Sequence, residues 1–125
     1  MTKYLTIQQV VEFQKILIKM YGGHPGIRDV NLLESALEAP KASFQNKQMY
    51  PSISDKAAAL LFHLAKNHPF FDANKRTAYV SLLAFFKMNS YKPKFKISDL
   101  EQIVVDVADG KITKVDLLKI FKSES

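Results

Sequence analysis

Ten consecutive residues, 68–77, combine more chemically capable side chains than any other stretch of the sequence, and they read His-Pro-Phe-Phe-Asp-Ala-Asn-Lys-Arg-Thr. A histidine accepts or donates a proton near neutral pH, so His68 is a candidate general base. Asp72 supplies the hard oxygen ligand that Mg²⁺ prefers. Lys75 and Arg76 place two positive charges side by side. The segment therefore predicts a site that binds an anion beside a base and a metal ligand.

Two predicted helices position this stretch. Residues 55–67 are rich in Ala and Leu, and Pro69 prevents that helix from continuing. A second apolar helical run begins at about Ala73, so the motif is a loop that opens a buried helix. The N-terminus of a helix presents unpaired N–H groups and a positive dipole end, which favour a phosphate. Lys75 and Arg76 in that first turn oppose the dipole, an arrangement that is unusual unless an anion binds there.

Three of the motif side chains also have structural interpretations. His68 is placed where a helix ends, and the helix dipole favours a histidine there. For Asp72, capping of the following helix is the alternative to metal binding, and Asn74 is equally suited to a cap. The combination of all three with the two cations that follow favours a catalytic site over these alternatives.

The remaining motif side chains are weighed in the same way. Lys75 and Arg76 have the ordinary alternative of solvated surface charges, which their position at the start of a helix argues against. Phe70 is interpreted as a core anchor that holds the loop, and Phe71 fits either the core or a substrate contact. Tyr79, three residues after Arg76, is predicted to face the core.

Two further histidines lie outside the motif. His63 precedes His68 by five residues, a spacing that does not place both on one face of a helix. We therefore predict that His63 packs or lies at the surface and does not bind a metal. His24 lies in a turn and is predicted to be exposed, although a place near the site is not excluded.

The pattern His-x-Phe-x-Asp-Ala-Asn-Lys-Arg resembles the motif of the Fic/Doc superfamily, in the form carried by Doc (death-on-curing) toxins. The general Fic form has glycines where this chain has Ala73 and Lys75, and a second arginine where it has Tyr79. At all three positions the chain departs from the general Fic form in the way that is typical of Doc toxins. Residues 21–37 are also similar to the N-terminal part of Doc proteins, so the resemblance covers most of the chain.

The resemblance implies a toxin of a toxin–antitoxin module, a kinase that transfers the γ-phosphate of ATP to a threonine of elongation factor Tu and so inhibits translation. His68 is then the general base, and Asp72 holds Mg²⁺. The phosphates are expected to bind Ala73, Asn74, Lys75 and Arg76. The alternative within the same family is transfer of AMP to a protein hydroxyl. The sequence contains no Walker-type phosphate-binding loop, so a P-loop enzyme is excluded.

Regulation is predicted in part. Many Fic proteins carry an inhibitory helix with the pattern Ser/Thr-x-x-x-Glu-Gly/Asn, and no glutamate of this chain is followed by glycine or asparagine. The resemblance therefore implies a separate antitoxin, whose disordered tail folds onto an apolar groove of the toxin.

Composition limits the other possibilities. A length of 125 residues predicts one domain, 1–125, and a net charge of +6 indicates an acidic partner or substrate. The rival interpretation is a non-enzymatic basic interaction or nucleic-acid-binding module. Direct nucleic-acid binding is not expected, because the basic residues are spread over several segments without a recognition-helix pattern. The absence of cysteine and of a long apolar stretch favours a cytoplasmic protein without a membrane partner.

The periodicity predicts an all-α fold, a compact bundle of about six helices around the central pair that carries the motif. The first helix spans 7–20, a short one spans 32–37, and the motif helix ends near Asn89. Helix caps are predicted at Thr6, at Asp29 or Asn31, at Ser54, at Ser98 and at Thr113. Residues 41–53 are predicted to be an irregular connection without a hairpin. In the resembled family this region holds a flap that lays a target segment beside the active site.

Overall fold

The fold is built from helices. The computed structural model describes residues 1–123, and its elements are, in chain order, α1 (Ile7–Tyr21), α2 (Val30–Glu38), the 3-10 turn η1 (Ala39–Lys41), β1 (Ser43–Phe44), β2 (Lys47–Gln48), α3 (Ile53–Asn67), α4 (Asn74–Met88), α5 (Ile97–Ala108) and α6 (Lys114–Ser123). The prediction of an all-α bundle with about six helices is confirmed. Within the part of the chain that the structure describes, no helix has the length and apolar character needed to cross a membrane.

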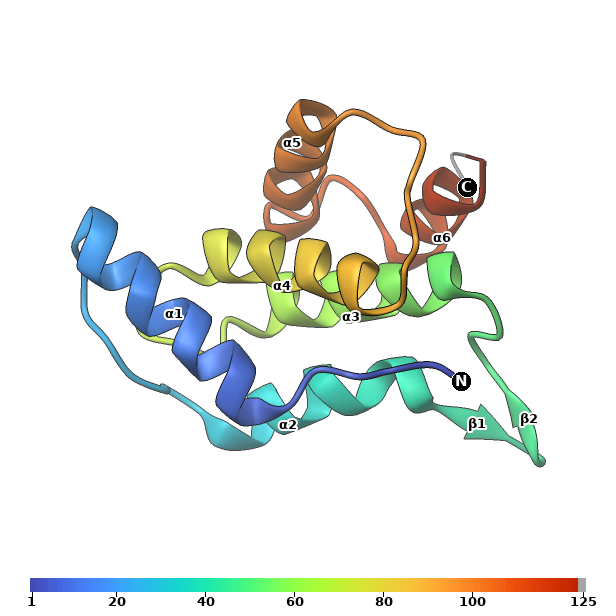
Figure 1. Cartoon of the computed structure of the whole chain (residues 1–125), viewed down its shortest axis with the longest axis horizontal. Helices are drawn as coiled ribbons and strands as arrows, with labels where there is room; N and C mark the ends of the chain where they lie inside the picture. Colours follow the sequence, from blue (N-terminus) through green and yellow to red (C-terminus); the bar gives the residue numbers. More distant parts are fainter. Residues whose placement is uncertain (124–125) are drawn as a thin grey trace.

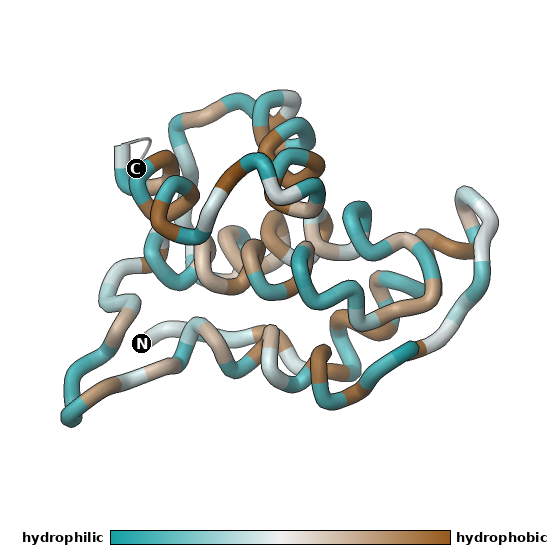
Figure 2. The backbone as a smooth tube through the Cα atoms, turned by 180° about the vertical axis from the view of Figure 1, so that it is seen from behind, coloured by the Kyte–Doolittle hydropathy of each residue, from teal (hydrophilic) through white to brown (hydrophobic). Residues whose placement is uncertain are grey.

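Helix α3 is the centre of the bundle and packs against α2, α4, α5 and α6. In Figure 1, α3 and α4 lie side by side, with α2 on one side of this pair and α5 and α6 on the other. The residues of α3 from Ser54 to Leu61 are all buried, as expected for a helix that has neighbours all round. The outer helices are amphipathic, and Figure 2 shows apolar and polar residues alternating along the turns of α5.

Three of the predicted helix caps are confirmed. The Thr6 hydroxyl accepts a hydrogen bond from the Gln9 N–H and forms a capping box with its side chain. The Asp29 carboxylate caps α2 by accepting from the Leu32 N–H over 3.1 Å. The Thr113 hydroxyl accepts from the Asp116 N–H over 3.1 Å at the start of α6. Helix α2 is longer than predicted, because Asp29 starts it at Val30.

Two predicted caps were wrong. Helix α3 is capped by Ser52 and not by Ser54, because Ser52 has the extended backbone of a cap and accepts the Asp55 N–H. Ser54 already lies inside the helix and is buried. Helix α5 begins after Lys96, without a side-chain cap, so Ser98 is also a helical residue. In both cases the hydrogen-bonded turn starts up to two residues before the serine that the pattern favours.

A short hairpin interrupts the connection between η1 and α3, where none was predicted. Strands β1 and β2 pair antiparallel, with Ser43 opposite Gln48. Gln45 and Asn46 form the turn with φ values of 52° and 66°, the left-handed pair that suits the twist of a two-residue hairpin. The Lys56 ammonium is buried and donates to the Gln48 side chain and to the Tyr50 carbonyl, which ties the hairpin to α3.

The hairpin and the motif lie at opposite ends of α3 (Figure 1). The hairpin leads into the first residue of this 15-residue helix and the motif follows its last residue. A helix of this length spans about 22 Å. In this structure the expected flap is therefore remote from His68, and it does not cover the motif.

Candidate active site

The motif forms a tight loop between α3 and α4. His68 ends α3 in the left-handed conformation, with φ 46° and ψ 57°. Ala73 precedes α4 and is also left-handed, with φ 63° and ψ 27°. Such conformations cost about 1–3 kcal/mol for residues other than glycine and persist only where surrounding contacts enforce them. The contacts that hold this loop are therefore part of the site.

Asn74 closes the loop on itself. Its side-chain oxygen accepts the N–H of Phe70, and its side-chain nitrogen donates to the carbonyl of Phe70, each over 2.9 Å. Phe70 in turn is only 1% exposed and belongs to the hydrophobic core. This pair fixes the loop against the core. In the structure the Asn74 amide is thus occupied by the backbone, and its predicted contact with phosphate stays a prediction.

The segment between α1 and α2 runs antiparallel to the motif loop. The N–H groups of Arg28 and Asp29 donate to the Pro69 carbonyl over 2.7 and 3.1 Å, and the Phe71 N–H donates to the Gly26 carbonyl over 3.2 Å. Ile27 and Phe70 form an isolated β-bridge between the two segments. The N-terminal stretch that shares the family resemblance thus serves as the backbone support of the motif.

The Arg28 guanidinium holds the residue that precedes the loop. It donates to the His68 carbonyl through Nε at 2.9 Å and through Nη2 at 2.6 Å, and to the Asn67 carbonyl at 3.1 Å. Carbonyls at the C-terminal end of a helix lack intrahelical partners and carry partial negative charge, so a cation is well placed there. Arg28 therefore fixes the backbone from which the His68 imidazole projects.

Asp72 is held by the chain that follows α1. The Asp72 Oδ2 accepts the N–H of His24 over 2.6 Å. The side chain of Gln14, which is fully buried, donates to the carbonyls of Asp72 and His24 over 3.2 and 3.4 Å and accepts the Gly26 N–H over 3.4 Å. One buried amide thus joins both segments. Neither Asp72 nor Asn74 caps α4, whose cap residue Ala73 has no side-chain hydrogen bond.

His24 lies beside the motif. Its imidazole Nδ1 donates to the Pro25 carbonyl at 2.7 Å, which assigns the proton to that nitrogen. The ring also contacts Phe71, with 4.6 Å between ring centroids. His24 is exposed, as predicted, and Phe71 is half exposed. His24 thus contacts two motif residues, Asp72 through its backbone N–H and Phe71 through its ring.

Most of the predicted site residues meet around one open hollow. The residues that line it are His68, Phe71, Asp72, Ala73, Asn74, Lys75 and Arg76, and its volume is about 310 Å³. Phe70, the predicted anchor of the loop, does not line it and lies in the core instead. The first turn of α4, which has no side-chain cap, opens onto this hollow. The arrangement brings a histidine, a carboxylate and a helix N-terminus together, which suits the binding of an anion.

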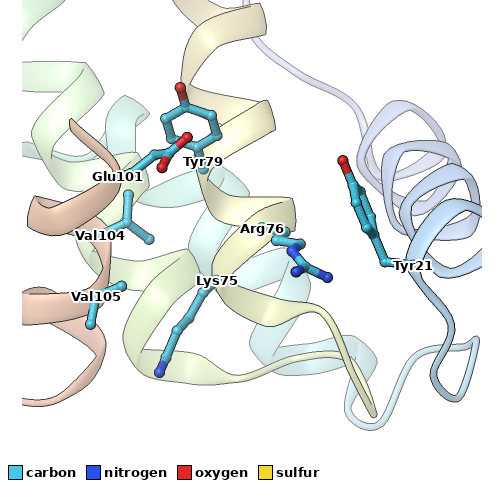
Figure 3. Close-up of a pocket in the computed structure, with 7 residues that line it drawn as sticks. All are labelled: Tyr21, Lys75, Arg76, Tyr79, Glu101, Val104 and Val105. Carbon is cyan, nitrogen blue, oxygen red and sulfur yellow. The ribbon is translucent and has the colours of Figure 1, made fainter. Parts of the chain in front are cut away.

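Lys75 and Arg76 diverge from the start of α4. The Lys75 ammonium lies 3.7 Å from an Asp109 carboxylate oxygen, with both side chains nearly half exposed, so this ion pair is weak. The Arg76 guanidinium lies over the ring of Tyr21 at 4.2 Å from its centroid. Figure 3 shows both side chains at the edge of a second pocket, which also includes Tyr79. Tyr79 is partly buried and packs against the hydrophobic core, as the sequence predicted, and it also lines this pocket.

A magnesium ion would find one protein carboxylate at this site, that of Asp72. Within residues 1–123, no three histidine, aspartate or glutamate side chains gather in a group that could bind a metal on its own. Mg²⁺ in nucleotide sites is often held by one or two carboxylates together with substrate phosphates and water. Asp72 fits that requirement, because His24 engages only its Oδ2. The donor set therefore suits a metal that arrives with a nucleotide.

His63 belongs to a different surface. Its Nε2 accepts from the Lys114 ammonium over 3.0 Å, and its ring meets Phe62 edge-on. Burial lowers the pKa of His63, and the neighbouring charge of Lys114 lowers it further. The structure thus places His63 in a half-buried contact between α3 and α6, away from the motif hollow.

Sequence reasoning assigned no role to three residues that support the site. Gln14 lies on the buried face of α1 together with Val10 and Leu17. A polar residue on an otherwise apolar face was the signal in the sequence that could have pointed to its role. Arg28 and His24 lie in the second stretch of family resemblance, but nothing local indicates that Arg28 would reach back to the end of α3 or that His24 would bind Asp72 through its backbone. Long-range hydrogen bonds of this kind have no periodicity to detect.

The chain matches known proteins over most of its length. The Fic/DOC family matches residues 4–86. Over 110 residues the chain is 36% identical to Toxin Doc of Mycolicibacterium smegmatis, an alignment that covers 86% of this chain and 82% of that protein. Over 114 residues it is 30% identical to Protein kinase doc of Escherichia phage P1, with 89% of this chain and 86% of that protein covered.

Proposed function

Because the chain belongs to the Fic/DOC family, we propose that it is the toxin of a toxin–antitoxin module and a protein kinase. The proposed reaction transfers the γ-phosphate of ATP to a threonine hydroxyl of elongation factor Tu, which inhibits translation in the cytoplasm. The observation that supports this proposal is the hollow in which His68, Asp72 and the open first turn of α4 meet.

His68 is proposed to act as the general base. Its imidazole takes the proton of the threonine hydroxyl while the oxygen forms a bond to the γ-phosphorus, and the bond from that phosphorus to the bridging oxygen of ADP breaks. General-base catalysis of this kind contributes about 10²–10⁴-fold in rate. Arg28 contributes indirectly, because its hydrogen bonds to the His68 carbonyl fix the backbone of the base.

The phosphates are proposed to bind at the first turn of α4. Backbone N–H groups from about Ala73 onward, together with Lys75 and Arg76, face the charge that develops on the transferred and leaving groups. Mg²⁺ would be held by Asp72 and would neutralise phosphate charge. Asn74 contributes the closed shape of the loop through its bonds to Phe70, and a phosphate contact in addition would require one of those bonds to open.

Two sequence features favour the kinase over transfer of AMP. Lys75 stands where the general Fic form has a glycine and Tyr79 stands where it has an arginine, and both departures are typical of the Doc form of the motif. AMP transfer remains the second candidate, because the same base and helix N-terminus serve either reaction when the nucleotide binds in the opposite direction.

An antitoxin with a disordered tail is the proposed inhibitor, since the chain has no inhibitory motif of its own.

The test is intact-mass spectrometry of elongation factor Tu after incubation with this protein, ATP and Mg²⁺. We expect a gain of one phosphate with the wild-type protein and no gain with His68→Ala. A gain of one AMP instead would replace the kinase by the second candidate. Full activity of His68→Ala would show that this histidine is not the base.

The same assay tests the phosphate-binding cations. We expect Lys75→Ala to slow the transfer because the phosphates are less well neutralised, and unchanged kinetics would remove Lys75 from the site. If elongation factor Tu is unmodified under all conditions, the target in the proposal is wrong. Incubation of a whole-cell lysate with labelled ATP then shows whether another protein accepts the phosphate.

A further inference from the structure

Lys75 lies between two spaces at the start of α4. It lines the motif hollow and also the second pocket, whose opposite wall is formed by α5 (Figure 3). Its ammonium lies 3.7 Å from a carboxylate oxygen of Asp109, which follows the last residue of α5. Within residues 1–123, Arg76 forms no ion pair and lies over a tyrosine ring instead. The two neighbouring cations of the motif are therefore not equivalent, because Lys75 alone of this pair has a counter-ion.

Each partner of this ion pair lies at the unfavourable end of its own helix. Lys75 is the second residue of α4, where the helix dipole is positive. Asp109 is the C-cap of α5, where the helix dipole is negative. Because the two helix ends approach each other, one ion pair offsets both unfavourable placements. The contact thus joins the end of α5 to the first turn of α4, on which the proposed phosphate binding depends.

The turn after α5 fixes the backbone from which the Asp109 side chain projects. The N–H of Gly110 donates to the Val107 carbonyl over 3.1 Å. The N–H of Lys111 donates to the Asp106 carbonyl over 2.9 Å. These two bonds form a Schellman motif, in which Gly110 adopts the left-handed conformation with φ 80°. Asp109 therefore belongs to a defined helix end and not to a free loop.

We propose that Asp109 is a positioning residue that competes with the nucleotide phosphates for Lys75. The inference rests on the proposed function, because it assumes that phosphates bind at the first turn of α4. In the empty site, the Asp109 carboxylate neutralises the Lys75 ammonium. When a nucleotide binds, the ammonium exchanges this carboxylate for phosphate oxygens, and no covalent bond changes.

The weakness of the ion pair suits a contact that is exchanged. The Lys75 and Asp109 side chains are 48% and 43% exposed, and ion pairs that water reaches in this way contribute little to stability. The polyphosphate of a nucleotide carries several negative charges, against the single charge of the carboxylate, so it attracts the ammonium more strongly. Asp109 therefore lowers the affinity for phosphates without preventing their binding.

The test measures binding of ATP with Mg²⁺ by isothermal titration calorimetry on the full chain at low salt. The main variant is Asp109→Asn, which keeps the shape of the side chain and removes its charge. The matched control is Asp99→Asn, which removes the same charge from an exposed residue in the first turn of α5, at the other end of this helix. Lys75→Met, alone and combined with Asp109→Asn, completes a double-mutant cycle.

We expect Asp109→Asn to bind ATP about two- to fivefold more tightly than the wild type, the scale of an exposed ion pair. Asp99→Asn should bind ATP as the wild type does, and Asp109→Asn should bring no gain in the Lys75→Met background. Unchanged or weaker binding by Asp109→Asn would overturn the inference. An equal gain from Asp99→Asn would overturn it as well, and so would a gain that persists without Lys75, because net charge would then explain the effect.

Two further measurements separate a competitor from a structural residue. In the transfer assay, Asp109→Asn should lower the KM for ATP and leave kcat nearly unchanged, because the ion pair is exchanged before the transition state. A lowered kcat without a lower KM would assign Asp109 a structural role. If Lys75→Met binds ATP too weakly for the cycle, the salt dependence decides. The gain from Asp109→Asn should disappear at high salt, where the ion pair is screened, and a gain that persists there overturns the inference.

Failure of the inference can be distinguished from failure of the proposed function. A wild-type protein that binds no ATP would overturn both together. Normal ATP binding by the wild type, without a gain in Asp109→Asn, would overturn the inference only.

Discussion

The backbone N–H of His24 donates to the Oδ2 of Asp72 over 2.6 Å, although 48 residues separate them. This bond fixes the rotation of the carboxylate and leaves its other oxygen for a metal. This close approach of His24 to Asp72 depends on Gly23, which has no side chain. A Cβ added at Gly23 would lie 3.3 Å from the Asp72 Cβ and 3.0 Å from Ile18. The placement of the proposed metal ligand therefore depends on a loop outside the motif.

Gly23→Ala should reduce Mg²⁺-dependent transfer strongly, because the new methyl group displaces Asp72 and the φ of 118° is strained for alanine. The matched control is Gly22→Ala, where φ is 87° but nothing lies within 4 Å of the added Cβ. Both variants should lose about 1–3 kcal/mol of stability from backbone strain. Initial rates of transfer, measured over a series of Mg²⁺ concentrations, should be reduced in Gly23→Ala only. Equal rates in the two variants would contradict this account of Asp72.

Gln14→Met should unfold at lower denaturant concentration and need more Mg²⁺ for half-maximal rate. The substitution keeps the volume but leaves the carbonyls of Asp72 and His24 and the Gly26 N–H without their partner. Loss of buried hydrogen bonds costs about 1–3 kcal/mol. Gln8→Met, at an exposed position of α1, is the control. An altered stability with an unchanged Mg²⁺ requirement would limit Gln14 to a structural role.

Arg28→Met should lower kcat by about tenfold or more while the KM for ATP changes little. Without the guanidinium the carbonyls of Asn67 and His68 lose their donor, and a base that is less well placed affects the transition state more than substrate binding. Arg28→Lys keeps the charge but not the forked geometry of the guanidinium. The kcat of Arg28→Lys should therefore fall between that of the wild type and that of Arg28→Met. A rate for Arg28→Lys equal to that of Arg28→Met would show that geometry alone matters, and a wild-type rate in both would refute the role.

Stability should decrease as the pH falls through the range in which His63 titrates. The folded state lowers the pKa of His63 below its ordinary value of 6.5, through burial and the charge of Lys114. Below pH 6.5 the unfolded state therefore binds more protons, which stabilises it relative to the folded state. Urea denaturation at pH 7.5 and at pH 5.5 should show a smaller loss for His63→Gln than for the wild type. An identical loss in both proteins would assign the effect to other groups.

Periodicity predicted most of the helices, and a local motif located the candidate site. The residues from His68 to Arg76 are contiguous, so a helix-ending proline and the apolar run that follows sufficed to place them at a helix N-terminus. The caps at Thr6, Asp29 and Thr113 were predictable for the same reason, since each bonds to a residue three positions away.

The supports of the site were not predictable, because they join distant parts of the chain. Gln14 reaches Asp72 across 58 residues and Arg28 reaches His68 across 40, and no local pattern encodes such a pair. The hairpin was missed for another reason. Its strands have only two residues each, too few to show alternation, and Asn46 adopts its left-handed turn without the glycine that usually marks one.

The hydrogen bonds that hold residues 67–72 come from residues 14–32 and from Asn74, all of which precede α5. Helices α5 and α6 are synthesised later, and α5 contributes instead to the wall of the neighbouring pocket. Substitutions in α5 can therefore reshape that wall while the loop and its base keep their support. The loop with the proposed base and the α5 wall of the second pocket are therefore held by different parts of the chain.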